Sequence, residues 1–210
     1  IQQGGTARLG VDDALPTDKD VRLGWTSGTL GTWDLAGFDQ TVGGLTVYGT
    51  AFTLRNNVIT NSAPSSLSTL TLDQAAGVSN AFPGRIVGAV HLVKAGAADS
   101  QLLLQDVNEF SGTATVAGGK LVLAGGAGSL GDACTNVVVD AGTLTVQNSS
   151  AISDNAVLML TSGGGAKVDL AEGVNETVGC LFVDDEMRRV GTYGSRNSAA
   201  KYKDDALFSG

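Results

Sequence analysis

The feature that most limits how this chain can fold is a segment that occurs twice. Asp34–Val47 reads DLAGFDQTVGGLTV, and Asp169–Val183 reads DLAEGVNETVGCLFV with one extra residue. The similarity extends upstream, so the two copies span residues 14–47 and 151–183, and Leu45 aligns with Leu181. A chain that repeats itself in this way is predicted to be a solenoid, in which each repeat packs against its neighbours.

A shorter repeat lies between the two copies. Val116–Leu123 (VAGGKLVL) matches Val139–Val146 (VDAGTLTV), with valine, glycine and two apolar residues at the same positions, after a step of about 23 residues. Both are short apolar alternations with a glycine turn, which predict strands, and no helical period competes with them. About six steps of this length equal the long offset between Leu45 and Leu181. The long repeat is therefore interpreted as about six turns of one coil.

A coil of about 20 to 25 residues with two or three short strands is typical of a parallel β-helix. The composition agrees, because 30 glycines, 3 prolines and 5% aromatic residues suit a chain that turns often. We predict an all-β fold, a right-handed parallel β-helix with coils of roughly 23 residues and little or no helix, over residues 1–210 as one segment. Stacked coils would bury ladders of Leu, Val and Ile, and outward-facing asparagines at the turns are expected to stack between coils.

Two motifs in the chain resemble those of a known family. Leu102–Leu123 combines a leucine-rich strand, an asparagine, an aromatic residue, Ser-Gly-Thr and Gly-x-Leu-x-Leu, and Leu35–Leu45 reads LAGFDQTVGGL. Both resemble the autotransporter-associated β-strand repeats of large bacterial surface proteins, and the resemblance covers most of the chain. The residues that carry these motifs and their copies are Gly37, Phe38, Thr41, Val42, Gly43, Leu45, Phe110, Gly112, Gly119, Leu121, Gly142, Leu144, Thr177, Gly179 and Leu181.

This resemblance implies a non-catalytic passenger segment at the bacterial cell surface, an extracellular stalk, adhesive element or display scaffold. The implied partners are further repeats of the same polypeptide or like segments end to end, and glycans or other molecules on a host or neighbouring cell. Two cysteines, and the lack of a translocator barrel or export sequence, depart from the family pattern. Because Ala206–Gly210 looks like the start of another repeat, we expect an excerpt of a longer protein.

The charge and hydropathy of the chain argue against two classes of partner. The formal charge is −8 and the isoelectric point is about 4.4, so nucleic acid phosphates would be repelled. No run of about 18 apolar residues occurs, so no membrane span is expected. We therefore expect neither a nucleic acid partner nor a span in this segment.

Catalytic motifs are weak in this sequence. His91 is the only histidine and is interpreted as a strand residue facing solvent or a satisfied core residue. The NTD and GHG segments of polygalacturonase-like β-helix enzymes are absent. Gly125–Gly126 and Gly163–Gly165 lack the context of a phosphate-binding loop and are interpreted as corners between coils. We therefore expect neither an enzyme nor a bound cofactor.

Clustered carboxylates raise the question of Ca²⁺, which takes several oxygen ligands at once. Neighbouring carboxylates on a strand point to opposite faces, and the calcium-binding nonapeptide is absent. We interpret them as solvated loop residues and expect no metal. The clusters are Asp12 with Asp13, Asp18 with Asp20, Asp184–Glu186, and Asp204 with Asp205.

The two cysteines, Cys134 and Cys180, are separated by twice the coil step. Regular coils would therefore place them two rungs apart, at about 9.6 Å. A disulfide needs Cα atoms within about 7 Å. Separate thiols are expected unless an irregular loop brings the two residues together.

Two alternatives to the stalk remain open. The first is a carbohydrate-binding or polysaccharide-cleaving β-helix with Trp25, Trp33 and Tyr193 as a sugar platform. It predicts these aromatic residues in line on one exposed face, whereas a stalk predicts Trp25 and Trp33 partly buried near a coil corner. The second is a self-assembling extracellular fibre unit, because open β-helix ends present unpaired backbone groups and neither end of the sequence shows an obvious cap.

Overall fold

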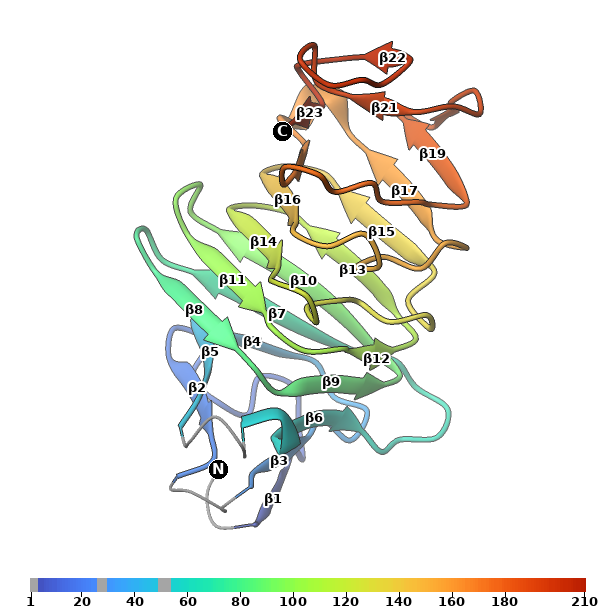
Figure 1. Ribbon diagram of the computed structural model, residues 1–210. Coiled ribbons are helices and arrows are strands. Elements are labelled where there is room, and N and C mark those ends of the chain that lie inside the picture. Colours follow the sequence, from blue (N-terminus) through green and yellow to red (C-terminus); the bar gives the residue numbers. More distant parts are fainter. Residues whose placement is uncertain (1–3, 26–29, 49–53) are drawn as a thin grey trace.

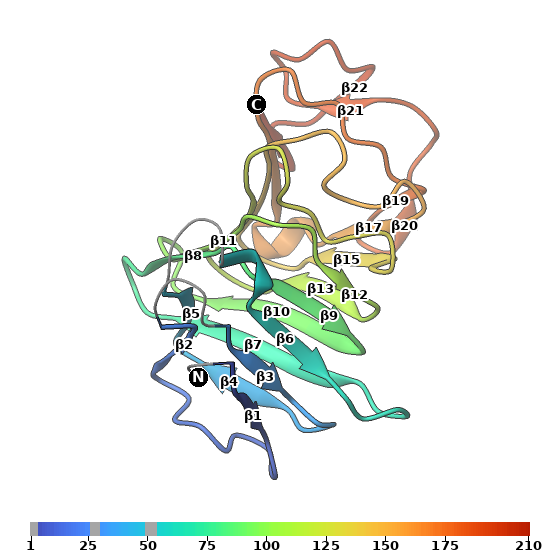
Figure 2. The ribbon, with the colours of Figure 1, turned by 60° about the horizontal axis from the view of Figure 1, so that its bottom comes forward.

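The computed structural model describes residues 4–25, 30–48 and 54–210. Within these residues the chain winds into a β-solenoid of about seven turns with three faces (Figure 1). All pairings between successive coils are parallel. Figure 2 brings the N-terminal end forward and shows strands of successive coils lying side by side along the axis. The predicted all-β solenoid is confirmed.

Each face is a stack of short strands. The first sheet contains β1 (Thr6–Arg8), β3 (Thr32–Asp34), β6 (Val58–Asn61), β9 (Arg85–Gly88) and β12 (Glu109–Phe110). The second contains β4 (Gln40–Val42), β7 (Ser68–Gln74), β10 (Val90–Gly96), β13 (Thr113–Val116), β15 (Asn136–Val139), β17 (Val157–Leu160), β19 (Cys180–Val183) and β20 (Glu186–Met187).

The third sheet contains β8 (Ser79–Phe82), β11 (Gln101–Leu104), β14 (Lys120–Leu123), β16 (Thr143–Val146), β18 (Lys167–Leu170) and β23 (Phe208–Ser209). The pair β2 (Asp20–Leu23) and β5 (Gly44–Val47) extends this face, because β5 lies beside β8. Outside the three faces, β21 (Tyr193–Gly194) pairs with β22 (Tyr202–Lys203). The helical turns in the described residues are two short 3₁₀ segments, η1 (Leu54–Asn56) and η2 (Ser162–Gly164).

The short repeat predicted from the sequence is the repeat of the coil. Val116 pairs with Val139 in the second sheet, and Leu121 pairs with Leu144 in the third. All four side chains are fully buried, so each repeat adds one rung to the apolar core. Burial of such side chains stabilises the fold by about 1.5–3 kcal/mol each.

The length of the coil is not constant. Gln101 of β11 pairs with Lys120 of β14, which is a short step, whereas Gln40 of β4 pairs with Leu70 of β7, which is a long one. The strands keep their register because the difference is taken up in the connections between faces. Loops of unequal length can therefore be added without disturbing the ladders.

The long repeat does not correspond to whole turns. Leu45 lies in β5 on the third face, whereas its counterpart Leu181 lies in β19 of the second sheet. Asp34 and Asp169 differ in the same way, because they lie in β3 of the first sheet and β18 of the third. The interpretation as about six turns holds only roughly, because the offset between the copies is six turns less one face. A strand–corner–strand unit can fold on any face, because every face meets the same core.

Close approach between coils explains the glycine of the SGT motif. A Cβ atom on Gly112 would lie 2.1 Å from the carbonyl oxygen of Val90 in the coil below. Gly142 has a positive φ of 78°, which glycine adopts readily. The corners of the solenoid therefore need glycine for space and for backbone conformation.

Buried asparagines link the coils through hydrogen bonds to the backbone. Asn108 is fully buried, and its Oδ1 accepts the N–H of Ile86 at 2.9 Å while its Nδ2 donates to the carbonyl of Ser129 at 2.8 Å. Asn57 accepts the N–H of Gly31 at 2.8 Å. The side chains satisfy backbone groups at corners where the strand ladder is interrupted, since buried unpaired groups would be costly.

The last coil contains a long excursion, residues 184–207, between its second and third faces (Figure 1). It begins with a hairpin in which β20 pairs antiparallel with β19, and the turn residues Asp184 and Asp185 have positive φ values of 51° and 63°. Two such residues are the signature of a type I′ turn. The hairpin covers the exposed edge of β19, a cap that the sequence did not reveal.

The chain returns from this excursion to the solenoid. Phe208–Ser209, which resemble the start of another repeat, form β23 and pair with β18. Ser209 Oγ also donates to Asp169 Oδ1 at 2.7 Å. These residues complete the third face of the last coil.

No helix within the described ranges is long and apolar enough to cross a membrane.

Candidate functional site

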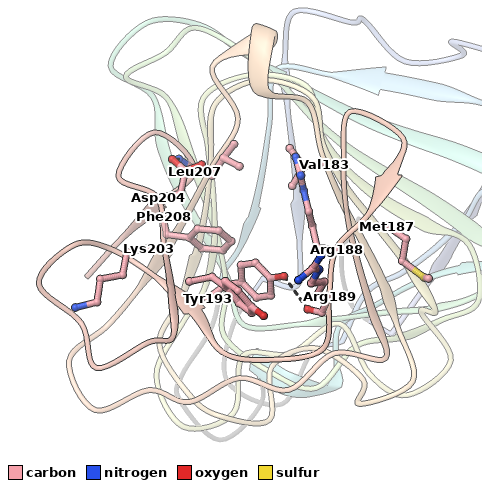
Figure 3. Close-up of a pocket in the computed structure, with 10 residues that line it drawn as sticks. Val183, Met187, Arg188, Arg189, Tyr193, Lys203, Asp204, Leu207 and Phe208 are labelled. Carbon is pink, nitrogen blue, oxygen red and sulfur yellow. Dashed lines mark hydrogen bonds between the residues drawn. The ribbon is translucent and has the colours of Figure 1, made fainter.

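A pocket of about 410 Å³ lies at the C-terminal end of the solenoid, between the last coil and the excursion 184–207 (Figure 3). Its base consists of Val183, Leu207 and Phe208, each 4–5% exposed. These residues form the C-terminal end of the apolar core. The other lining residues are Met187, Arg188, Arg189, Tyr193, Tyr202, Lys203 and Asp204. The pocket therefore combines an apolar base with a charged rim.

Tyr193 forms one wall of the pocket and is fixed on several sides. Its ring stacks on Tyr202 with centroids 4.9 Å apart and lies 6.2 Å from the ring of Phe208. Its hydroxyl donates to the carbonyl of Arg189 at 2.7 Å. This bond joins Arg189 of the rim to Tyr193, and it fixes the position of the tyrosine ring.

The charged side chains of the rim differ in orientation. In Figure 3, the Arg188 side chain lies close to Tyr193, whereas the amino group of Lys203 points away from the pocket. Lys203 Nζ instead donates to the carbonyl of Arg196 at 3.1 Å. Asp204 Oδ1 accepts the N–H of Ala206 at 2.9 Å, so this carboxylate is engaged in a turn. Arg188 is thus better placed than Lys203 to meet a ligand.

The three aromatic residues of the predicted sugar platform do not meet on one face. Trp33 is fully buried in β3, inside the core, and Trp25 is 43% exposed beyond the end of β2. Tyr193 lies at the opposite end of the solenoid (Figure 1). The platform in line is therefore absent, and Trp33 cannot face a ligand. The stalk's expectation of partial burial also fails at Trp33, because core packing in β3 buries it completely.

Trp25 belongs to a different surface cluster. Its ring lies 5.4 Å from that of Tyr48, and the guanidinium of Arg22 lies 5.9 Å from the Tyr48 ring. These residues follow or belong to β2 and β5.

The acidic pair at the N-terminal end has a structural role. Asp12 Oδ1 accepts the N–H of Asp39 at 2.8 Å, and Asp13 Oδ1 accepts the N–H of Thr41 at 2.8 Å. Asp39 in turn accepts the N–H of Thr69 in the following coil at 2.6 Å. These carboxylates connect successive coils across a corner.

Residues of the remaining acidic clusters are also engaged, one with an adjacent coil and two in local contacts. Asp184 accepts bonds from the N–H and the hydroxyl of Ser162, and these bonds hold the pKa of its carboxyl below the usual range. Asp205 accepts the N–H of Arg196 at 2.5 Å. Asp18 pairs with the neighbouring Lys19. Across residues 4–25, 30–48 and 54–210, no three His, Cys, Asp or Glu side chains gather as metal ligands would.

His91 faces outward from β10 and also bridges two coils. Its Nδ1 accepts the N–H of Thr113 at 2.9 Å. This is one of the interpretations that the sequence left open, a strand residue on the solvent side with a hydrogen-bond partner.

The two cysteines are separate thiols, as regular coils predicted. Cys134 is fully buried, and its burial raises the pKa of the thiol to about 11. Cys180 is half-buried in β19, where it pairs with Val157.

A buried lysine was not expected from the sequence. Lys94 is fully buried in β10, and its ammonium donates to the carbonyl of Ala95, to Ser100 Oγ at 2.9 Å and to the carbonyl of Gly118 at 3.4 Å. Burial lowers its pKa to about 8, while the charge of Asp73 acts in the opposite direction. The alternation of VHLVK places Lys94 on the same side as Val90 and Leu92, which was the available signal.

No protein-family model, no curated protein and no solved structure matches this chain.

Proposed function

We propose that this chain is a non-catalytic structural segment of a large exported bacterial surface protein, in which it acts as a rigid stalk or display scaffold. The observation that supports this proposal best is the continuity of bonding between coils. Parallel ladders run through the three faces, and side chains such as Asn108 and Asp39 bond the backbone where the ladders stop. A solenoid bonded in this way gives length and resistance to proteases.

The placement of the carboxylates also favours a structural role. Asp12, Asp13 and Asp39 accept backbone N–H groups of an adjacent coil. A general acid or base would instead need to reach a substrate. The bacterial surface location and the adhesive role follow the resemblance to autotransporter-associated repeats, and they form the finer part of this proposal.

Limited proteolysis with thermolysin at elevated temperature tests the scaffold role. A rigid solenoid should be cut only in the excursion 184–207 and near its N-terminal end, and the fragment that contains β7 to β18 should persist. Uniform digestion of the coils within minutes would contradict the proposal. Trypsin provides an independent check. It should cut after Arg188 or Arg189 in the excursion, because the neighbouring Val190 is 99% exposed.

A further inference from the structure

We propose that the C-terminal pocket binds a small organic anion with a flat apolar body, of the aryl carboxylate class. This binding function does not depend on the scaffold role. It rests on the shape of the pocket, the chemistry of its base, and the position of its cation.

The size and shape of the pocket suit such a ligand. Its volume of about 410 Å³ lies within the range of small-molecule sites, about 300–1,000 Å³. Tyr193 stacks on Tyr202, lies 6.2 Å from Phe208 between ring centroids, and is bonded to the carbonyl of Arg189. Because these contacts hold the ring in place, binding would cost little further ordering of side chains.

The base of the pocket selects an apolar body. Val183, Leu207 and Phe208 contribute aliphatic and aromatic surface at the end of the core. Tyr193 adds aromatic surface, because its ring stacks on Tyr202 and lies at a tilt of 34° to Phe208. An aryl group can fill the apolar space between these residues.

The rim selects an anion. The ion pair of Arg188 is with Glu186 at 3.7 Å, and the two side chains are 39% and 79% exposed. Such an exposed pair is weak, so Arg188 can exchange this partner at little cost. A carboxylate at the mouth of the pocket could accept two parallel N–H bonds from its guanidinium. Lys203 and Asp204 are engaged elsewhere.

Isothermal titration calorimetry with 2-naphthoate tests the proposal. We expect a dissociation constant on the order of 0.1–1 mM for a ligand of this size. Arg188→Gln should weaken binding about tenfold, because it removes the charge-assisted bonds. Arg196→Gln is the matched control, because Arg196 belongs to the same excursion but pairs with Asp205 at 3.3 Å outside the pocket. Its affinity should equal that of the unmodified chain.

Two further ligands and one further variant separate the parts of the proposal. Naphthalene-2-methanol, which lacks the charge, and glucuronate, which lacks the apolar body, should each bind at least tenfold more weakly than 2-naphthoate. Val183→Phe fills the pocket from its base and should abolish binding while the thermal unfolding curve stays cooperative. Equal binding by Arg188→Gln and Arg196→Gln, equal binding of either control ligand, or no binding of 2-naphthoate would overturn the proposal.

Discussion

Glu176 accepts a hydrogen bond at 2.6 Å from the backbone N–H of Ile152, one coil earlier. Gln40, its counterpart in the long repeat, makes the equivalent contact with Leu15: its Oε1 accepts the N–H at 2.9 Å and its Nε2 donates to the carbonyl at 3.0 Å. Leu15 and Ile152 are themselves aligned in the two copies. The long repeat thus preserves a contact between coils, although its copies lie on different faces.

Glutamine suits this contact better than glutamate at neutral pH. Burial raises the pKa of Glu176, the backbone bonds from Ile152 and Ala151 lower it, and the charge of Asp154 raises it further. The folded chain therefore binds this proton more tightly than the unfolded chain. The resulting stabilisation is present at low pH and is lost as the pH rises from the unfolded pKa through the raised folded pKa.

We expect Glu176→Gln to increase the free energy of unfolding at pH 7 by up to about 1 kcal/mol. At a pH below the ordinary range of glutamate the variant should match the unmodified chain. Urea denaturation at both pH values measures this difference. Glu172→Gln, in the exposed part of the same loop, is the control and should show no such pH-dependent gain. A loss of stability at pH 7 in Glu176→Gln would contradict the account.

Gly112→Ala tests the close approach between coils. The added Cβ would meet the carbonyl of Val90 at 2.1 Å, and a backbone group cannot turn aside as a side chain can. We expect a loss of about 1–3 kcal/mol, as for overpacking in a core. Gly126→Ala is the matched control, since a Cβ there meets no atom within 4 Å. Thermal unfolding of both variants decides the point, and equal melting temperatures would refute the packing argument.

The sequence was sufficient to predict the rungs. Val116 and Leu121 recur as Val139 and Leu144 one coil later, and inward apolar positions must align when coils stack, so pattern and register coincide. The sequence did not show that the two copies of the long repeat lie on different faces. Coil length varies, and the long step between Gln40 and Leu70 has no periodic signal. Periodicity identifies a rung but does not count the residues in its loops.

The pocket could not be predicted, because it is made by residues that follow no repeat. Arg188 and Tyr193 lie in the excursion, whose path depends on the Asp184–Asp185 turn. The available signal was a strand followed by two residues that tolerate positive φ and then by more residues that can form a strand. Tyr193 was singled out only as an exposed aromatic residue, and its ring partners Tyr202 and Phe208 come from a later part of the excursion and from β23.

Lys94 predicts an unusual alkaline response. Because burial lowers its pKa to about 8, the unfolded chain binds this proton more tightly than the folded chain between pH 8 and the ordinary lysine value. The contribution of Lys94 to stability should therefore rise with pH through this window. Between pH 7 and pH 10 we expect the unmodified chain to gain about 1–3 kcal/mol relative to Lys94→Met.

Denaturant midpoints of both proteins at both pH values measure this difference, and other alkaline effects cancel in the comparison. Lys120→Met, at an exposed position of β14, should show no such change. An unchanged difference between Lys94→Met and the unmodified chain at the two pH values would contradict the assigned burial.

Asp185→Gly tests the turn of the hairpin. Asp185 has a φ of 63°, where glycine avoids a steric cost of about 1 kcal/mol. We expect slower hydrogen exchange at the N–H of Arg188, which donates to the carbonyl of Leu181 across the hairpin. Asp184→Gly is the contrasting variant: it also relieves φ but loses both bonds from Ser162, so no net protection is expected. Faster exchange in Asp185→Gly would show that the turn is not of this type.

The most direct test of the proposed function uses the protein in its source cells. An antibody against the folded segment should label intact, unpermeabilised cells, and it should capture from the envelope a polypeptide whose intact mass is many times the 21.2 kDa of this chain. This result would support a structural segment of a giant surface protein. Labelling only after permeabilisation, or a captured polypeptide no heavier than this chain, would contradict the account.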